Sequence, residues 1–325
     1  MKLLLSAVSM FILLTSCEEL DPKQQGNLVP KTVDQDASIP SITINGTQLH
    51  AETFGDPADP MIIFLHGGPG SDYRNALQVS QLAADGFYIV FYDQRGSGLS
   101  KRHPLDSYTI EVMFDDLRAV IEHYRTTPQQ KVFLFGHSWG AMLAAGYINS
   151  YPDRINGAIL AEPGGLTWES AKEYGQMIRK LRLFSEATND ALYTDQFLSG
   201  DENQHEMLDY KLGISSSYAY ADGNEEGIEG PSPFWRMGAV VLNSLTKIGE
   251  DEGFDFTTNL DQYTSKVLFL YSENNRAYGL TFAQNEASYF PNTEIARVDD
   301  TGHEMIYFGW GNVYPIVSTY LNSVK

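Results

Sequence analysis

The strongest constraint on how this chain can fold is the segment Phe135-Gly136-His137-Ser138-Trp139-Gly140. An apolar run typical of a strand, Lys131–Phe135, leads into it, and small residues typical of a helix, Ala141–Tyr147, follow it. A reversal this sharp holds its middle residue in a strained, outward-pointing conformation, and the flanking glycines remove side chains that would collide there. The segment therefore predicts that Ser138 is presented at the start of a helix, as a serine nucleophile is. The alternative is a glycine-rich turn whose serine only caps the helix.

The N-terminus has the pattern of an export signal. Lys2 precedes a mainly apolar run, Leu3–Leu14, that is too short to span a bilayer. The run ends in Leu14-Thr15-Ser16-Cys17, which resembles the lipobox of bacterial lipoproteins, and Cys17 is the single cysteine of the chain. We expect residues 1–16 to be a signal peptide, Cys17 to carry lipid such as palmitate, and the polar residues 17–40 to be a flexible tether. The alternative is an ordinary signal peptide with a chance cysteine. The lipid would anchor the exported protein to a membrane on its periplasmic or cell-surface face.

Charge and cysteine content exclude several classes of protein. The chain has 42 acidic residues against 22 lysines and arginines, a formal net charge of −20. Such a field repels phosphate backbones and anionic lipid surfaces, so we expect no nucleic-acid partner and a membrane contact that depends on lipid. One cysteine cannot form an internal disulfide, and the sequence has neither an H-E-x-x-H motif nor a Cys/His cluster. Neither a metal nor another cofactor is implied, and the oligomeric state is left open.

Beyond residue 40, strand-like and helix-like runs alternate. Asn45-Gly46 divides Ser41–Phe54 into a hairpin, and a helix is expected over Thr109–Tyr124 with Thr109 as its cap. Further strands are expected at Met61–Leu65, Phe87–Tyr92, Lys131–Phe135, Ile155–Ala161, Lys266–Tyr271 and Glu294–Val298. This alternation predicts an α/β fold with a mostly parallel sheet, helices on both faces, and a site at the carboxyl ends of the strands.

A second glycine-rich turn, His66-Gly67-Gly68-Pro69-Gly70, directly follows one of these strands. Because Gly67 and Gly68 lack side chains, backbone N–H groups there can approach a substrate oxygen closely. The N–H groups of Gly68 and Trp139 are therefore predicted to form an oxyanion hole. A plain tight turn is the alternative, and the presence of the serine motif further along the chain favours the functional interpretation.

Three motifs together resemble, in order and spacing, the proline iminopeptidase branch of the α/β-hydrolase superfamily. They are His66-Gly67-Gly68-Pro69-Gly70, Asp93-Gln94-Arg95-Gly96-Ser97-Gly98 and Gly136-His137-Ser138-Trp139-Gly140. The resemblance implies an eight-stranded core, a helical cap inserted after the sixth strand, and serine-dependent cleavage of an N-terminal residue from a peptide. It also makes Asp93–Gly98 a structural turn, with no catalytic role for Arg95. The family more often has glycine where His137 stands.

The regular pattern breaks between residues 164 and 255, which we assign to the cap, leaving 41–163 and 256–325 as the core. Helical stretches are expected around Thr167–Ser185 and Asp190–Phe197, followed by an irregular acidic run from Ser199 to Pro233. Several aromatic residues could line a pocket or simply pack: Trp168, Tyr174, Phe184, Tyr218, Phe234 and Trp235. In the resembled family, carboxylates of the cap hold the free amine of the substrate, but no acidic residue of this cap aligns with them.

The resemblance also implies a general base, because these hydrolases place a Gly-His just after the last strand. His303 occupies that position. At the usual position of the acid, after the seventh strand, this chain has Asn275. An amide can orient an imidazole but cannot stabilise an imidazolium by charge.

Three possibilities remain for the acid: Glu162, Glu273, or none. We favour Glu162, which ends the sixth strand, because related hydrolases such as haloalkane dehalogenases place the acid there. The order Ser138, Glu162, His303 also keeps the superfamily's order of nucleophile, acid and base. Alternatively, Glu162 is a pocket carboxylate that binds a substrate amine.

The sequence thus favours a lipid-anchored serine hydrolase that acts on a short peptide or other small molecule through an acyl-enzyme. Ser138 is the expected nucleophile, His303 the base and Glu162 the acid. A carboxylesterase or lactonase is the alternative within the enzymes. A non-catalytic binding lipoprotein with a degenerate triad is the alternative outside them.

Overall fold

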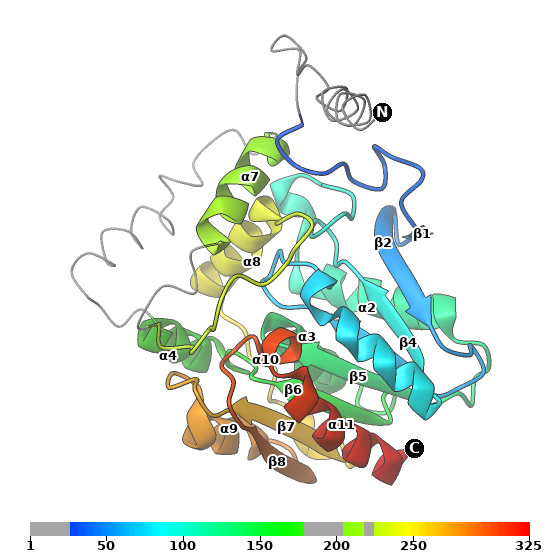
Figure 1. Cartoon of the computed structure of the whole chain (residues 1–325), viewed down its shortest axis with the longest axis vertical. Helices are drawn as coiled ribbons and strands as arrows, with labels where there is room; N and C mark the ends of the chain where they lie inside the picture. Colours follow the sequence, from blue (N-terminus) through cyan, green and yellow to red (C-terminus); the bar gives the residue numbers. More distant parts are fainter. Residues whose placement is uncertain (1–26, 179–203, 218–223) are drawn as a thin grey trace, which may run out of the picture.

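The computed structural model describes residues 27–178, 204–217 and 224–325, so the predicted signal peptide and Cys17 lie outside the described residues. An eight-stranded sheet forms the centre of the molecule (Figure 1). Its strands are β1 (Ser41–Ile44), β2 (Thr47–Phe54), β3 (Met61–Leu65), β4 (Tyr88–Tyr92), β5 (Val132–His137), β6 (Gly157–Ala161), β7 (Val267–Ser272) and β8 (Thr293–Val298). The strand order is β1-β2-β4-β3-β5-β6-β7-β8. Strand β2 is antiparallel to both of its neighbours, β1 and β4, and β3 to β8 are parallel to one another. The predicted α/β-hydrolase sheet is confirmed.

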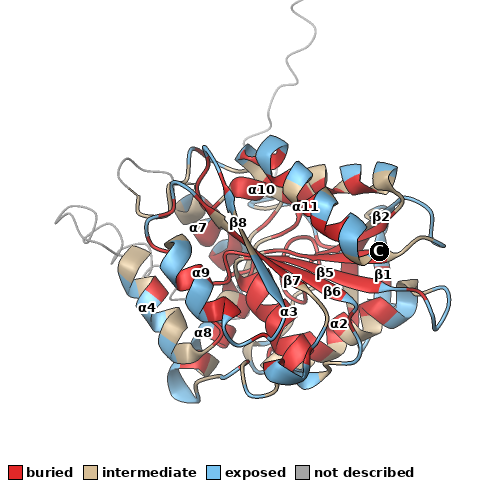
Figure 2. Cartoon of the chain, turned by 90° about the horizontal axis from the view of Figure 1, so that it is seen from below, coloured by how far each residue is buried: buried red, intermediate tan, exposed pale blue. Residues whose placement is uncertain are grey.

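Helices cover both faces of this sheet (Figure 2). On one face lie the 3₁₀ helix η1 (Arg74–Asp85), α10 (Met305–Phe308) and α11 (Trp310–Val324), and on the other lie α2 (Ile110–Tyr124) and α3 (Trp139–Ser150). Two single turns, η2 (Leu105–Ser107) and η3 (Leu260–Gln262), and α9 (Gly279–Ala287) complete the core. Strands β3 to β6 are buried along their whole length because both of their faces are covered, which explains their continuous apolar runs. Thr109 caps α2 as predicted, accepting a hydrogen bond from Val112 N (3.2 Å).

The insertion after β6 contains the helices α4 (Trp168–Ile178), α7 (His205–Ser216) and α8 (Ala239–Asp251). An antiparallel bridge between Thr167 and Asp255 joins its two ends. Helix α7 lies in the stretch predicted to be irregular. Its Leu208 and Leu212, four residues apart, are buried among residues of α8, so packing outweighs the low helix propensity of its glycine and serines. The predicted helix at Asp190–Phe197 and the whole part of the Thr167–Ser185 stretch beyond Ile178 lie outside the described residues. No helix in the described parts of the chain is both long and apolar enough to cross a membrane.

The last part of the predicted tether packs on the folded domain, so the expectation of a flexible tether up to residue 40 is wrong from about Pro30 onward. Thr32 and Val33 are buried. Val33 N donates to Leu99 O (2.8 Å), and Arg236 Nη1 donates to Pro30 O (2.8 Å). Backbone carbonyl and N–H groups of the segment make these contacts. The polar side chains of the segment therefore did not predict them.

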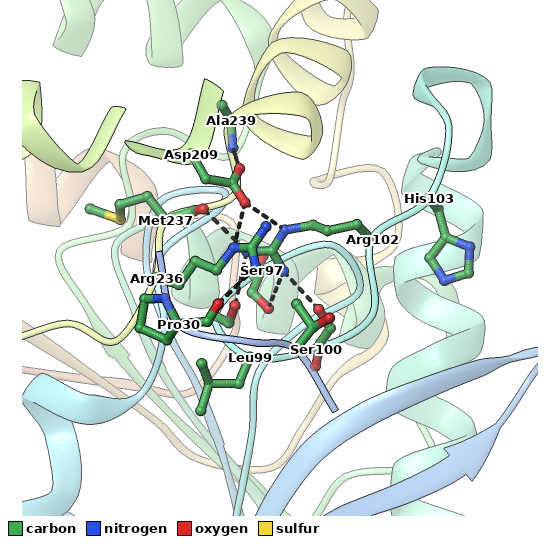
Figure 3. Close-up of polar contacts among 12 residues, drawn as sticks. Pro30, Ser97, Leu99, Ser100, Arg102, His103, Asp209, Arg236, Met237 and Ala239 are labelled. Atoms are coloured by element: carbon green, nitrogen blue, oxygen red, sulfur yellow. Dashed lines mark hydrogen bonds and ion pairs between the residues drawn. The ribbon is translucent and has the colours of Figure 1, made fainter. Parts of the chain in front are cut away.

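A buried cluster of charges lies beneath this segment (Figure 3). Arg102 Nε and Arg236 Nε both donate to Asp209 Oδ2, at 2.9 and 2.7 Å, and Ala239 N donates to Asp209 Oδ1 (2.9 Å). Arg102 follows the Asp93–Gly98 turn of the core, whereas Asp209 belongs to α7 of the cap. The cluster therefore ties core, cap and N-terminal segment together.

Candidate active site

Ser138 occupies the turn between β5 and α3 with a backbone φ of 55°, which a residue with a side chain rarely adopts. Its N–H donates to Ala161 O on the neighbouring strand β6 (2.9 Å). The turn depends on its two glycines, because a Cβ at Gly136 would lie against Ala141 N and one at Gly140 against Leu65 O. The strain that the motif predicts is present, and it is held by the packing of α3 on β3 and β5.

The glycine-rich turn after β3 is held against this serine turn by Gln94. Gln94 N donates to His66 Nε2 and Gln94 Nε2 donates to His66 O, both at 2.9 Å. The indole of Trp139 completes the connection by donating from Nε1 to Gln94 Oε1 (2.9 Å). Burial lowers the pKa of His66, so its ring stays neutral and can accept the hydrogen bond from Gln94 N. Gly67 comes so close that a Cβ there would lie 3.2 Å from Ser138 Cβ.

A cavity of about 450 Å³ opens over Ser138. Gly68, Trp139 and His303 also line it. Its volume is within the range of pockets for small organic ligands. Among the aromatic residues singled out from the sequence, Trp168, Tyr174 and Phe234 line the cavity, whereas Trp235 packs against the rings of His50 and Tyr73. Phe184 and Tyr218 lie outside the described residues.

His303, after β8, and Glu162, after β6, are in direct contact. His303 Nδ1 lies 2.7 Å from Glu162 Oε2. The Glu162 carboxylate is fully buried, and its other oxygen accepts hydrogen bonds from Ser272 N (2.7 Å) and Ser272 Oγ (2.6 Å). Asn275 Nδ2 donates to Glu162 Oε2 (2.7 Å). Glu162 also has a positive φ of 44°, so the backbone is strained at this residue as it is at Ser138.

Glu273, the second candidate for the acid, is bound to other groups than His303. Its carboxylate pairs with Arg297 Nη1 (3.3 Å) and accepts a hydrogen bond from Asp300 N (3.0 Å), and its side chain is partly exposed. The structure therefore places Glu162, and not Glu273, against His303.

Two further carboxylates, which the sequence did not single out, line the cavity. Glu226 Oε1 lies 3.9 Å from His303 Nε2 and accepts a hydrogen bond from Tyr174 Oη (2.6 Å). Glu304 accepts from Asn75 Nδ2 (2.8 Å). The abundance of acidic residues in the cap was the only signal for Glu226. Its proximity to His303 is a tertiary contact that no local pattern encodes.

Comparison with known proteins supports the fold assignment. A family described as "Serine aminopeptidase, S33" matches residues 56–209, which include Ser138 and Glu162. The crystal structure of a proline iminopeptidase from Mycobacterium smegmatis superposes with a TM-score of 0.62 over 87% of this chain and 97% of the other, at 16% identity. The protein has the α/β-hydrolase fold. Nothing finer than the fold follows from a structural likeness at this identity.

Curated proteins similar to this chain include proline iminopeptidases. That of Lactobacillus helveticus is 33% identical over 168 residues, which cover 49% of this chain and 56% of the relative. That of Heyndrickxia coagulans is 27% identical over 285 residues, covering 81% of this chain and 91% of the relative. The chain thus spans a little over half the length of the first of these relatives.

The buried contacts of this site favour an ionic pair between Glu162 and His303. Burial opposes charge on Glu162, but hydrogen bonds from His303 and Ser272 and the charge of His303 outweigh it and lower the pKa of Glu162. Burial also opposes charge on His303, yet Glu226 and Glu162 raise its pKa to about 9. Burial and the neighbouring His303 lower the pKa of His137 to about 3. The neutral His137 ring can then donate from Nε2 to His303 O (2.8 Å), which fixes the backbone of His303.

Cys17, the predicted lipidation site, lies outside the described residues. Within the described ranges, no group of three or more His, Cys, Asp or Glu side chains is placed to hold a metal ion.

Arg95, to which the sequence assigned no catalytic role, pairs with Asp116 on α2 at 2.8 Å.

Proposed function

We propose that this protein is a serine hydrolase that removes the N-terminal residue of a short peptide through an acyl-enzyme. The observation that carries the proposal is the contact of His303 with the buried Glu162 at the wall of the same cavity that Ser138 lines. Nucleophile, base and acid come from the carboxyl ends of β5, β8 and β6, where sites lie in open α/β sheets.

In the proposed reaction, Ser138 Oγ attacks the peptide carbonyl while His303 Nε2 takes its proton. Glu162 stabilises the imidazolium that forms. The backbone N–H groups of Gly68 and Trp139 stabilise the oxyanion, a contribution of about 3–4 kcal/mol for a single donor in similar sites. His303 then returns the proton to the leaving amine, and water hydrolyses the acyl-enzyme with His303 again as base.

Cleavage after a single residue is supported by the position of Glu226. A free α-amino group lies only about 2.5 Å from the carbonyl carbon of its own residue. Glu226 Oε1 is 3.9 Å from His303 Nε2, the nitrogen that must approach Ser138 Oγ. A carboxylate this near to the reacting atoms suits the ammonium group of the residue being cleaved. Each further residue would move the amine about 3.3–3.6 Å away in an extended peptide.

An esterase or lactonase is the second candidate, favoured by the apolar wall of the cavity, which includes Met142, Leu242, Leu245 and Phe254. Turnover of proline and alanine 2-naphthylamides beside p-nitrophenyl acyl esters separates the two activities. The proposal expects the naphthylamides to be cleaved with the higher kcat/KM, and a preference for long acyl esters would favour the second candidate.

Labelling with a fluorophosphonate probe tests the nucleophile itself. We expect wild type to be labelled at Ser138 and Ser138→Ala to remain unlabelled. Absence of labelling in folded wild type would leave a non-catalytic binding lipoprotein as the better account.

We also propose that the enzyme is exported and anchored to a membrane through lipid on Cys17, on the strength of the Leu14-Thr15-Ser16-Cys17 pattern. Wild type should incorporate radiolabelled palmitate and sediment with membranes. Cys17→Ser should take up no label and should be either uncleaved or soluble. Failure of the wild type to take up palmitate contradicts this proposal without affecting the catalytic one.

A further inference from the structure

Each ring nitrogen of His303 faces a carboxylate. Nδ1 lies 2.7 Å from Glu162 Oε2, and Nε2 lies 3.9 Å from Glu226 Oε1. An imidazole between two carboxylates is stabilised in its protonated form. In the proposed reaction, however, Nε2 must be unprotonated to accept the proton of Ser138. The resting site therefore holds its base in the form that cannot act.

The position of Glu226 is determined by several contacts. Its backbone carbonyl accepts a hydrogen bond from His303 N (2.8 Å), and its carboxylate accepts one from Tyr174 Oη (2.6 Å). Glu229, three residues on, accepts a hydrogen bond at Oε1 from Gly302 N (2.8 Å). Gly302 has no side chain, and a Cβ there would collide with this same segment. The carboxylate of Glu226 is thus held beside the base by the packing of two loops.

The other groups that face His303 contribute little negative charge. His137, at the end of β5, is buried, and burial together with the nearby His303 lowers its pKa to about 3. Burial raises the pKa of Glu304, which favours the neutral acid. The phenol of Tyr174, whose ring centroid lies 6.3 Å from that of His303, has a pKa raised well above its usual value, first by burial. Among the described residues, Glu226 and Glu162 therefore contribute most to holding the proton on His303, and Glu304 adds a smaller contribution.

We propose that the N-terminal ammonium group of a substrate activates the enzyme by pairing with Glu226 and thereby releasing His303 to act as the base. This inference rests on the proposed function. An ammonium ion at Glu226 neutralises that carboxylate and repels a second positive charge on the nearby imidazole. His303 then loses the Nε2 proton to water and keeps the Nδ1 proton that it shares with Glu162. A substrate without a charged amine leaves His303 protonated beside Glu226.

The pH dependence of kcat/KM for two kinds of substrate tests the proposal. p-Nitrophenyl acetate has no amine, so its kcat/KM in wild type should still rise with pH up to about 9, where His303 loses its proton. For alanine 2-naphthylamide, kcat/KM should reach its maximum at lower pH. It should then fall as the substrate amine deprotonates near about 7.7–8.0.

Glu226→Gln removes the charge and keeps the shape of the side chain. For the ester, this change should shift the midpoint of the pH profile downward and raise kcat/KM at pH 7 by about tenfold for each unit of that shift. For the naphthylamide it should lower kcat/KM. The matched control is Glu225→Gln, because Glu225 is the adjacent residue and its carboxylate pairs with Arg276 Nε (3.1 Å) instead of lining the cavity. The control should leave both pH profiles unchanged.

A second readout does not depend on activity. NMR of protein labelled with ¹³C at histidine Cε1 follows the protonation of His303 directly in wild type and in Glu226→Gln. If Glu226→Gln is unstable, Glu226→Asp, which shortens the side chain by one methylene, should shift the midpoint in the same direction by less.

The possible outcomes separate the inference from the proposed function. An unchanged His303 titration and an unchanged ester profile in Glu226→Gln overturn the inference, even if peptides are cleaved. Absence of turnover and of fluorophosphonate labelling in wild type overturns the proposed function, while the NMR titration still decides whether Glu226 controls the proton on His303.

Discussion

Asn275 donates a hydrogen bond from Nδ2 to Glu162 Oε2 (2.7 Å), the same oxygen that lies 2.7 Å from His303 Nδ1. The amide is oriented by its own oxygen, which accepts hydrogen bonds from Ala277 N (3.0 Å) and Tyr278 N (3.1 Å). Asn275 stands after β7, where the resembled family has its acid. In this chain Asn275 donates a hydrogen bond to Glu162, which follows the neighbouring strand. An amide at position 275 is therefore compatible with an ion pair between Glu162 and His303.

Asn275→Asp should make the protein less stable as pH rises. The new carboxylate would lie against Glu162, and two like charges at this distance raise the pKa of the added acid above its unfolded value of about 3.9. The folded state then binds more protons than the unfolded state, so stability relative to wild type falls with increasing pH. The difference in Tm between wild type and the variant should be larger at pH 8 than at pH 5. An equal difference at both pH values contradicts this account of the pair.

Local motifs predicted most of the core and part of the site. The hairpin at Asn45-Gly46, the buried strands and the turn at Ser138 depend on short-range conformational preferences, so they could be read from consecutive residues. The contact of Glu162 with His303 could be anticipated because Glu162 directly follows β6 and His303 lies in the loop after β8, at the same carboxyl edge of the parallel sheet. The acid role of Glu162 remains a prediction.

The cap was less predictable because tertiary packing determines it. Helix α7 is stabilised by burial against α8, in spite of its glycine and serines. Glu226 reaches His303 through the packing of two loops far apart in sequence. The docking of residues around Pro30 depends on a buried arginine of the cap, Arg236, which composition cannot reveal.

In Glu286→Gln, the free energy of unfolding should decrease less from pH 5 to pH 8 than it does in wild type. Glu286 Oε2 accepts a hydrogen bond from Leu166 N (2.7 Å) at the start of the cap, and burial raises the pKa of Glu286 to about 7. Because the folded state holds this proton more tightly than the unfolded chain, stability decreases as pH rises from about 4.3 towards 7. Glutamine can keep the hydrogen bond and does not titrate. The effect is measured as Tm at several pH values for the variant, for wild type and for the exposed control Glu250→Gln. If the Tm of all three proteins changes with pH in parallel, the prediction is contradicted.

Asp209→Ala should destabilise the protein by about 3–5 kcal/mol, because it leaves two buried guanidinium groups without their counter-charge. Asp209 is buried and bonded to both Arg102 and Arg236 (Figure 3). Lys172→Ala, which breaks an exposed pair with Glu169, should destabilise the protein far less, because solvent screens this pair. Urea denaturation compares the two variants. Similar small losses for both would mean that the Asp209 cluster does not hold the cap to the core.

The most direct test of the account is the steady-state kinetics of Glu162→Gln with alanine 2-naphthylamide, beside Glu273→Gln as the control. If Glu162 stabilises the imidazolium in the transition state, kcat should fall by about 10⁴-fold with little change in KM. Glu273 faces Arg297 and solvent, so its variant should stay within about twofold of wild type. An unchanged kcat in Glu162→Gln, or a rise in KM alone, would contradict the assignment of Glu162 as the acid that completes the site.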